Sequence, residues 1–194
     1  MKRSARGRIV VLVAFLALAA IAGIAFYRYQ ANRPNLAPDF TLTDQAGRRF
    51  ALSEQRGRAV ALFFGYGHCP DICPTTLAAL ARARASLGSR AVDVEIAFVT
   101  VDPERDTPAV LGKYVALFDP SIVALTGTPA QLDPVYKAYF VYHEKQKPDG
   151  SANGYAVSHS AAIYMIDRSG RLRTVGSWDD DYRSLARTLE ELLS

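Results

Sequence analysis

Two cysteines carry the most informative chemistry in this sequence. The chain of 194 residues has only two, Cys69 and Cys73, which lie in the run Cys-Pro-Asp-Ile-Cys-Pro. Thiolates are nucleophiles in disulfide exchange and soft metal ligands, so this spacing favours thiol redox chemistry or metal binding. A structural disulfide is the third alternative, although closing so short a loop would restrict the unfolded chain by only about 2 kcal/mol.

The elements around the cysteines place them at the end of a buried strand. Residues 58–66 contain the continuous apolar run Ala-Val-Ala-Leu-Phe-Phe, which predicts a central strand buried on both faces. Residues 74–87 have apolar residues at helical spacing, with Pro74 expected as the first helical residue. Ligands bind at the carboxyl ends of strands in open α/β sheets, and a helix N-terminus lowers the pKa of a thiol.

Strands and helices continue to alternate along the chain. We expect a hairpin around residues 45–47, a second buried strand at 92–101, and a helix from 107 to about 118 that opens on Thr-Pro. Further expected elements are a strand at 122–125, a helix at 129–139, a hairpin at 161–176 and a last helix at 179–193. This alternation predicts an α/β sandwich with a thioredoxin-like fold.

The N-terminal region predicts a membrane anchor. Residues 1–8 carry four positive charges, and residues 9–27 form an uncharged apolar run. At roughly 1.5 Å per residue, this run is long enough for a transmembrane helix across the ~30 Å hydrocarbon core. The four cations before it outnumber Arg28 and Arg33 after it, which predicts a cytoplasmic N-terminus. A cleaved signal peptide is the alternative, but its apolar region is usually shorter.

The predicted organisation has four parts. They are a basic cytoplasmic N-terminus (residues 1–8), a transmembrane helix (9–27), a linker (28–37) and a thioredoxin-like domain (38–194) in the periplasm or another extracytoplasmic space. The protein would thus be a single-pass protein of the inner (cytoplasmic) membrane. The net charge of +4 comes from the N-terminal region, because removing its six basic residues leaves 17 basic against 19 acidic residues. This mildly acidic remainder excludes nucleic acid as an expected partner.

From about residue 37 to the C-terminus, the chain resembles the Sco/SenC family. That family has a thioredoxin-like fold and binds copper in assembly of the CuA site of cytochrome c oxidase. Residues 69–74 look like its CPxxCP motif, and residues 101–107, Val-Asp-Pro-Glu-Arg-Asp-Thr, look like its DPERDT segment. Residues 157–160, Val-Ser-His-Ser, are similar to the segment that holds the family's distal histidine. Gly67 and Ser158 are minor departures from the residues that the family often has there.

The resemblance implies that Cys69, Cys73 and His159 are copper ligands. Thiolates suit Cu(I), and an added imidazole makes a site that can also hold Cu(II). By itself, His159 fits a hydrogen-bonded core histidine equally well. Thioredoxin-type reductases place a cis-proline before the corresponding strand, however, and residues 154–166 contain no proline. Its absence favours a ligand at this position.

Three other polar residues lie near these motifs. His68 is expected to support the cysteine loop rather than bind metal, because adjacent side chains usually point in different directions. Asp102 follows a predicted central strand, where it would either affect the electrostatics of a metal or simply end the strand in an Asp-Pro turn. His143 is expected on the surface.

Two functions agree with these residues. The first is a membrane-anchored copper metallochaperone for the CuA site in subunit II of cytochrome c oxidase, with another extracytoplasmic copper carrier or a thiol reductant as a further candidate partner. The second is a thiol-disulfide oxidoreductase whose catalytic pair, Cys69 and Cys73, reduces the cysteines of that subunit. The two can coexist, because a dithiol that binds copper can also exchange with a disulfide.

Overall fold

The computed structural model describes residues 12–13, 15, 18–24, 35–146 and 154–194. The chain forms two compact units, Met1–Asn35 and Leu36–Ser194. The predicted basic N-terminus, most of the predicted linker and part of the predicted membrane span lie outside the described residues. The described residues of that span are helical. Within the described part of the chain, no helix is both long enough and apolar enough to cross a membrane.

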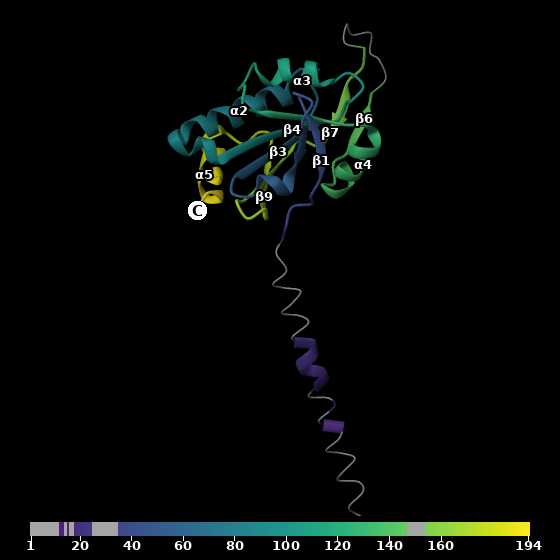
Figure 1. The fold of residues 1–194 in the computed structure, drawn as a ribbon, viewed down its shortest axis with the longest axis vertical. Helices are drawn as coiled ribbons and strands as arrows, with labels where there is room; N and C mark the ends of the chain where they lie inside the picture. The colour runs from purple at the N-terminus through teal and green to yellow at the C-terminus, as the bar shows by residue number, and fades with distance from the viewer. Residues whose placement is uncertain (1–11, 14, 16–17, 25–34, 147–153) are drawn as a thin grey trace, which may run out of the picture. The chain divides into compact units, whose positions relative to one another are not determined.

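A seven-stranded mixed sheet runs through the second unit (Figure 1). Its strand order is β2-β1-β5-β4-β3-β8-β9. The central strands β3, β4 and β5 are parallel, and antiparallel strands flank them on both sides. The strands are β1 (Thr41–Asp44), β2 (Arg49–Ala51), β3 (Ala59–Gly65), β4 (Val94–Thr100), β5 (Val123–Thr126), β8 (Ala162–Ile166) and β9 (Leu172–Ser177).

Helices cover both faces of this sheet. The α-helices of the unit are α2 (Ile72–Ser86), α3 (Pro108–Val115), α4 (Pro129–Ala138) and α5 (Tyr182–Leu192). Successive side chains of a strand point to opposite faces. On one face, Phe63 of β3 packs against Phe98, which in turn packs against Tyr114 of α3. On the other face, Phe64 packs against Tyr136 of α4.

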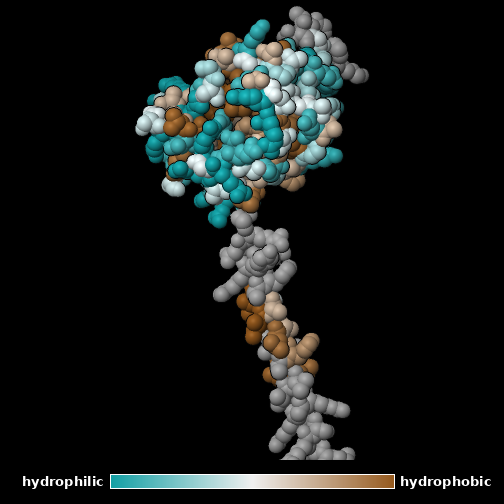
Figure 2. Space-filling view, in the orientation of Figure 1, coloured by the Kyte–Doolittle hydropathy of each residue, from teal (hydrophilic) through white to brown (hydrophobic). Residues whose placement is uncertain are grey.

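The predicted central strand is confirmed. Every residue of β3 and of β4 is buried, as a strand covered on both faces requires. Together with the helices on each face, this gives the predicted thioredoxin-like α/β sandwich. Figure 2 shows mainly hydrophilic and neutral residues on the visible face of this unit, with hydrophobic residues scattered among them.

Some boundaries differ from those predicted. The helix α2 begins at Ile72, two residues before the expected Pro74, so Cys73 lies in its first turn. Proline is tolerated there because the first four N–H groups of a helix have no partner within the helix. The strand β4 begins at Val94 because the preceding residues Gly88–Asp93 form a 3₁₀ turn.

A small two-stranded sheet was not predicted. Its strands, β6 (His143–Lys145) and β7 (Val157–His159), pair in antiparallel fashion. Each has only three residues, and β6 is exposed throughout, so neither shows the apolar pattern by which strands are recognised. The strand β7 matters for function because it ends on His159.

Candidate metal centre

The cysteines lie where β3 ends and α2 begins. Cys73 is fully buried in the first turn of α2, whereas Cys69 in the preceding loop is half-buried. The Cys73 backbone N–H donates a hydrogen bond to the Cys69 sulfur at 3.4 Å. A methyl group at Gly65 would lie 2.7 Å from the Cys73 sulfur and 2.7 Å from Phe98 Cε2. Glycine at the end of β3 therefore leaves the space in which the Cys73 sulfur lies.

The antiparallel pairing of β8 with β3 brings His159 to the cysteines. Phe63 lies opposite Ile163, so the chain entering β8 runs beside the chain leaving β3. The His159 Nε2 atom is 3.5 Å from the Cys73 sulfur. The Nδ1 atom is 2.8 Å from the backbone oxygen of Ser160, which can only accept a hydrogen bond, so Nδ1 carries a proton and donates it to this oxygen. Nε2 is then the ring nitrogen that faces the sulfurs and is placed to serve as a metal ligand.

The two sulfurs and the imidazole nitrogen form a compact group. The ligand atoms of Cys69, Cys73 and His159 all lie within 4.8 Å of one another. Two donors at roughly 2.0–2.3 Å from one ion, the bond lengths of zinc sites, are at most about 4.6 Å apart. A small closing movement would thus let all three side chains bind the same ion. Neither cysteine is in a disulfide.

The two cysteines have opposite acidities. The pKa of Cys69 is lowered to about 4, chiefly by a hydrogen bond from the Cys73 thiol and further by His159 and backbone N–H groups. The same hydrogen bond, with burial, raises the pKa of Cys73 far above its ordinary value. The pair therefore shares one proton near neutral pH, and Cys73 holds it. The half-exposed Cys69 is a thiolate.

His68 contacts Asp106 and is not part of the group of three. Its Nδ1 lies 3.6 Å from Asp106 Oδ1, and neither atom has a hydrogen-bond partner among the described residues. The other oxygen, Asp106 Oδ2, accepts hydrogen bonds from the Gly67 N–H at 3.0 Å and the Thr100 hydroxyl at 2.6 Å. The fully buried Asp106 thus fixes the loop just before Cys69, and burial raises its pKa. Sequence reasoning missed this residue, although it belongs to the DPERDT segment.

Asp102 supports the other side of the site. It is fully buried at the end of β4 and accepts hydrogen bonds from the Tyr155 hydroxyl, at 2.7 Å, and from Arg105 Nε. Its backbone N–H donates to the Thr100 hydroxyl. One of these bonds, that with Tyr155, joins the turn after β4 to the segment before β7, and none of them goes to the three ligand candidates. The Asp102 carboxylate thus has a larger structural role than the alternative of a simple Asp-Pro turn at the end of the strand.

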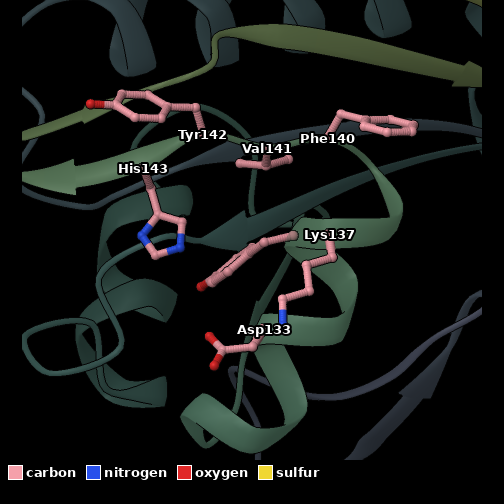
Figure 3. Close-up of a pocket in the computed structure, with 7 residues that line it drawn as sticks. Asp133, Lys137, Phe140, Val141, Tyr142 and His143 are labelled. Atoms are coloured by element: carbon pink, nitrogen blue, oxygen red, sulfur yellow. The ribbon is translucent and has the colours of Figure 1, made fainter.

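His143 is exposed, as predicted, and its Cα lies opposite that of His159 in the small sheet. Its ring centroid is 4.4 Å from that of Tyr136. Figure 3 shows His143 and Asp133 extending into the same groove, from β6 and α4 respectively. The groove has a volume of about 480 Å³, and none of the three ligand candidates lines it.

A known family and several solved structures are similar to this chain in sequence and fold. The model of the family described as SCO1/SenC matches residues 28–194. The copper-bound structure of Bradyrhizobium japonicum ScoI is 37% identical, with a TM-score of 0.74 over 81% of this chain and 99% of that chain. Copper-bound yeast Sco1 is 32% identical, with a TM-score of 0.71 over 81% of this chain and 88% of that chain.

Curated proteins also match most of this chain. The SCO2-like protein of Rickettsia prowazekii is 37% identical over 68% of this chain and 64% of its own length. The bovine mitochondrial SCO2 homolog is 38% identical over 79% of this chain and 56% of its own length. The chain spans less than two thirds of the length of both relatives. With a family match that covers most of its residues, the chain belongs to the SCO1/SenC family.

Proposed function

We propose that this protein binds one copper ion through Cys69, Cys73 and His159 and serves assembly of the CuA site in subunit II of cytochrome c oxidase. The observation that carries the proposal is the convergence of two sulfurs and one imidazole nitrogen within 4.8 Å at the end of β3. The copper-bound structures of two relatives support it. The oxidase role is the one that the Sco/SenC resemblance implies.

The donor set fits copper. Sulfur ligands are soft and suit Cu(I), while the imidazole lets the same site hold Cu(II). Cys69 supplies a thiolate at neutral pH, and Cys73 has to lose its proton when it becomes a ligand. Copper uptake should accordingly release one proton near neutral pH.

Exposure suggests how copper would leave the site. Cys69 and His159 are partly exposed, whereas Cys73 is fully buried behind them. A ligand of the oxidase subunit can therefore replace Cys69 or His159 first, while Cys73 still holds the ion. Such stepwise exchange suits a carrier that hands over copper directly to a protein site.

The proposal includes a membrane anchor. In it, residues 1–8 lie in the cytoplasm, residues 9–27 span the membrane, and residues 28–37 link the span to the extracytoplasmic domain at 38–194. The described residues of the span support an environment of lipid, because their large apolar side chains are exposed. These are Leu12, Val13, Phe15, Leu18, Ile21 and Ile24. An anchored domain would stay near an oxidase subunit that is assembled in the same membrane.

Thiol-disulfide exchange is the second candidate function, and the unequal acidities of the cysteines favour it. The Cys69 thiolate would attack a disulfide of the oxidase subunit and release one of its sulfurs as a thiolate. Cys73, after losing its proton, would then attack the mixed disulfide. The subunit would leave with two thiols, and this chain with a Cys69–Cys73 disulfide that a separate thiol reductant must reduce.

The substitution His159→Ala separates the two functions, with His143→Ala as the matched control. The control removes an exposed imidazole from the neighbouring strand, directly opposite His159 in register. For a copper carrier, we expect His159→Ala to fold and keep both thiols reactive. It should lose most of its Cu(II) affinity and less of its Cu(I) affinity, because two thiolates still hold Cu(I). His143→Ala should bind both ions normally.

Three measurements decide the outcome. These are the affinities for Cu(I) and Cu(II), the thiolate-to-copper charge-transfer absorption, and oxidase activity in cells that carry each variant. Normal Cu(II) affinity in folded His159→Ala would refute the ligand assignment. Normal oxidase activity in cells with a copper-deficient His159→Ala would instead favour the reductase, since exchange between Cys69 and Cys73 does not require the imidazole.

A further inference from the structure

Tyr155 is held at three points by two residues of the turn after β4. Its hydroxyl donates a hydrogen bond to Asp102 Oδ1 at 2.7 Å. Its backbone oxygen accepts one from Arg105 Nη1 at 2.8 Å, and the Arg105 guanidinium carbon lies 3.6 Å from the centroid of its ring. Asp102 and Arg105 also form an ion pair with each other. We call these three residues the tyrosine latch.

The tyrosine latch is buried enough to hold its geometry. The Asp102 side chain is 0% exposed and that of Arg105 is 17% exposed. Ion pairs and hydrogen bonds shielded from water are stronger than exposed ones, and loss of one partner leaves a buried charge without compensation. The stacked guanidinium and the hydroxyl together fix both the position and the rotation of the Tyr155 ring.

Only one residue separates Tyr155 from β7, the strand that ends on His159. At the start of β7, the Val157 N–H donates a hydrogen bond to the Tyr66 hydroxyl at 3.3 Å. The Tyr66 ring in turn meets the His159 ring edge to face, with centroids 5.7 Å apart. A displacement of Tyr155 would therefore be passed to the strand and then to the imidazole.

We infer that the tyrosine latch positions the His159 imidazole for copper, with Tyr155 as the positioning residue. The inference rests on the proposed function of His159 as a copper ligand. Tyr155 itself does not touch the metal. Its role is to hold β7 so that Nε2 stays within reach of both sulfurs before copper arrives, which lowers the cost of ordering the site on binding.

The test is Tyr155→Phe, with Tyr142→Phe as the matched control. Each change removes one phenol hydroxyl, but the Tyr142 hydroxyl bonds only the exposed side chain of Glu144 among the described residues. In Tyr155→Phe the ring can still stack on Arg105, so the fold should persist while the bond to Asp102 is lost. The first readout is the nuclear Overhauser contact between the Tyr66 and His159 rings in copper-free protein. The second is the affinity for Cu(II) and Cu(I).

We expect Tyr155→Phe to weaken the ring contact and to shift the His159 resonances. Its Cu(II) affinity should fall about 10-fold, the lower end of what outer-shell partners of metal ligands contribute. Cu(I) affinity should change less, and Tyr142→Phe should match the wild type throughout. If copper-free Tyr155→Phe has the same His159 resonances and the same contact between the Tyr66 and His159 rings as the control, the inference is overturned, whatever the copper affinities are. If the wild type shows no thiolate-to-copper absorption, the proposed function fails instead, and the copper-free spectra still decide the inference.

Discussion

Gly65→Ala tests whether the space at the end of β3 is needed for the site. The added methyl group would lie 2.7 Å from the Cys73 sulfur and from Phe98 Cε2. Favourable contacts between such atoms begin near 3.5 Å, so each of the two contacts must widen by roughly 0.8 Å. Both neighbours are fully buried, and protein interiors are packed closely enough that a change of even one methylene group is felt.

The free energy of unfolding should fall by about 1–2 kcal/mol. Overpacking of a well-packed core costs typically 1–3 kcal/mol. Loss of glycine's freedom in the unfolded chain offsets about 0.4–1 kcal/mol of this. The movement of the Cys73 sulfur should also alter its 3.5 Å contact with His159 Nε2, so Cu(II) affinity should fall as well.

Urea denaturation and copper titration of the same preparations measure both effects. The matched control is Gly112→Ala in α3, where the methyl group would meet only side-chain carbons of Gln45, at 3.4 and 3.5 Å. Because alanine is favoured over glycine in a helix by up to about 1 kcal/mol, the control should be as stable as the wild type or more so. If Gly65→Ala has the same free energy of unfolding and the same Cu(II) affinity as the control, the space at Gly65 is not needed for the site.

Three further predictions concern the thiols and the domain. Iodoacetamide should alkylate Cys69 at a nearly constant rate from neutral pH down to about pH 5, and more slowly as the pH falls through about 4, because protonation then removes the thiolate. The alkylation rate is measured by mass spectrometry, and a midpoint of its pH dependence at about 8.5 would contradict the lowered pKa. Oxidation to a Cys69–Cys73 disulfide should abolish copper binding, since a disulfide has no thiolate to offer; equal copper uptake by oxidised and reduced protein would exclude both cysteines from the site. A fragment that starts near Asn32 should be folded and soluble by circular dichroism and gel filtration, and a need for detergent would show that the domain boundary is misplaced.

The sequence was sufficient for the parts of the fold that depend on local patterns. The apolar run of β3, the Thr107 cap of α3 and the glycine turn between β1 and β2 each specify their element within a few residues. The cysteine loop could be placed for the same reason, because it lies between a recognisable strand and a recognisable helix. The predicted membrane span stays a prediction.

The support around the site could not be predicted from local patterns. Asp102 and Tyr155 are 53 residues apart in the chain, and Gly67 and Asp106 are 39 apart. Such contacts form only when the fold brings the turn after β4 beside the segment before β7 and the loop after β3. The unequal acidities of the cysteines come chiefly from the hydrogen bond between them, and the burial of Cys73 that adds to the difference depends on the packing of α2 near the end of β3.

The burial of Cys73 behind Cys69 also bears on damage by peroxide. The accessible Cys69 thiolate is the sulfur that hydrogen peroxide oxidises first, to a sulfenic acid with hydroxide as the leaving group. The Cys73 thiol is hydrogen-bonded to Cys69, so the Cys73 sulfur can attack the sulfenic sulfur, release its oxygen as water with the thiol proton, and form a disulfide. That disulfide is reducible, whereas sulfinic and sulfonic acids are not ordinarily recovered. The site thus contains the thiol that diverts an oxidised Cys69 from irreversible loss.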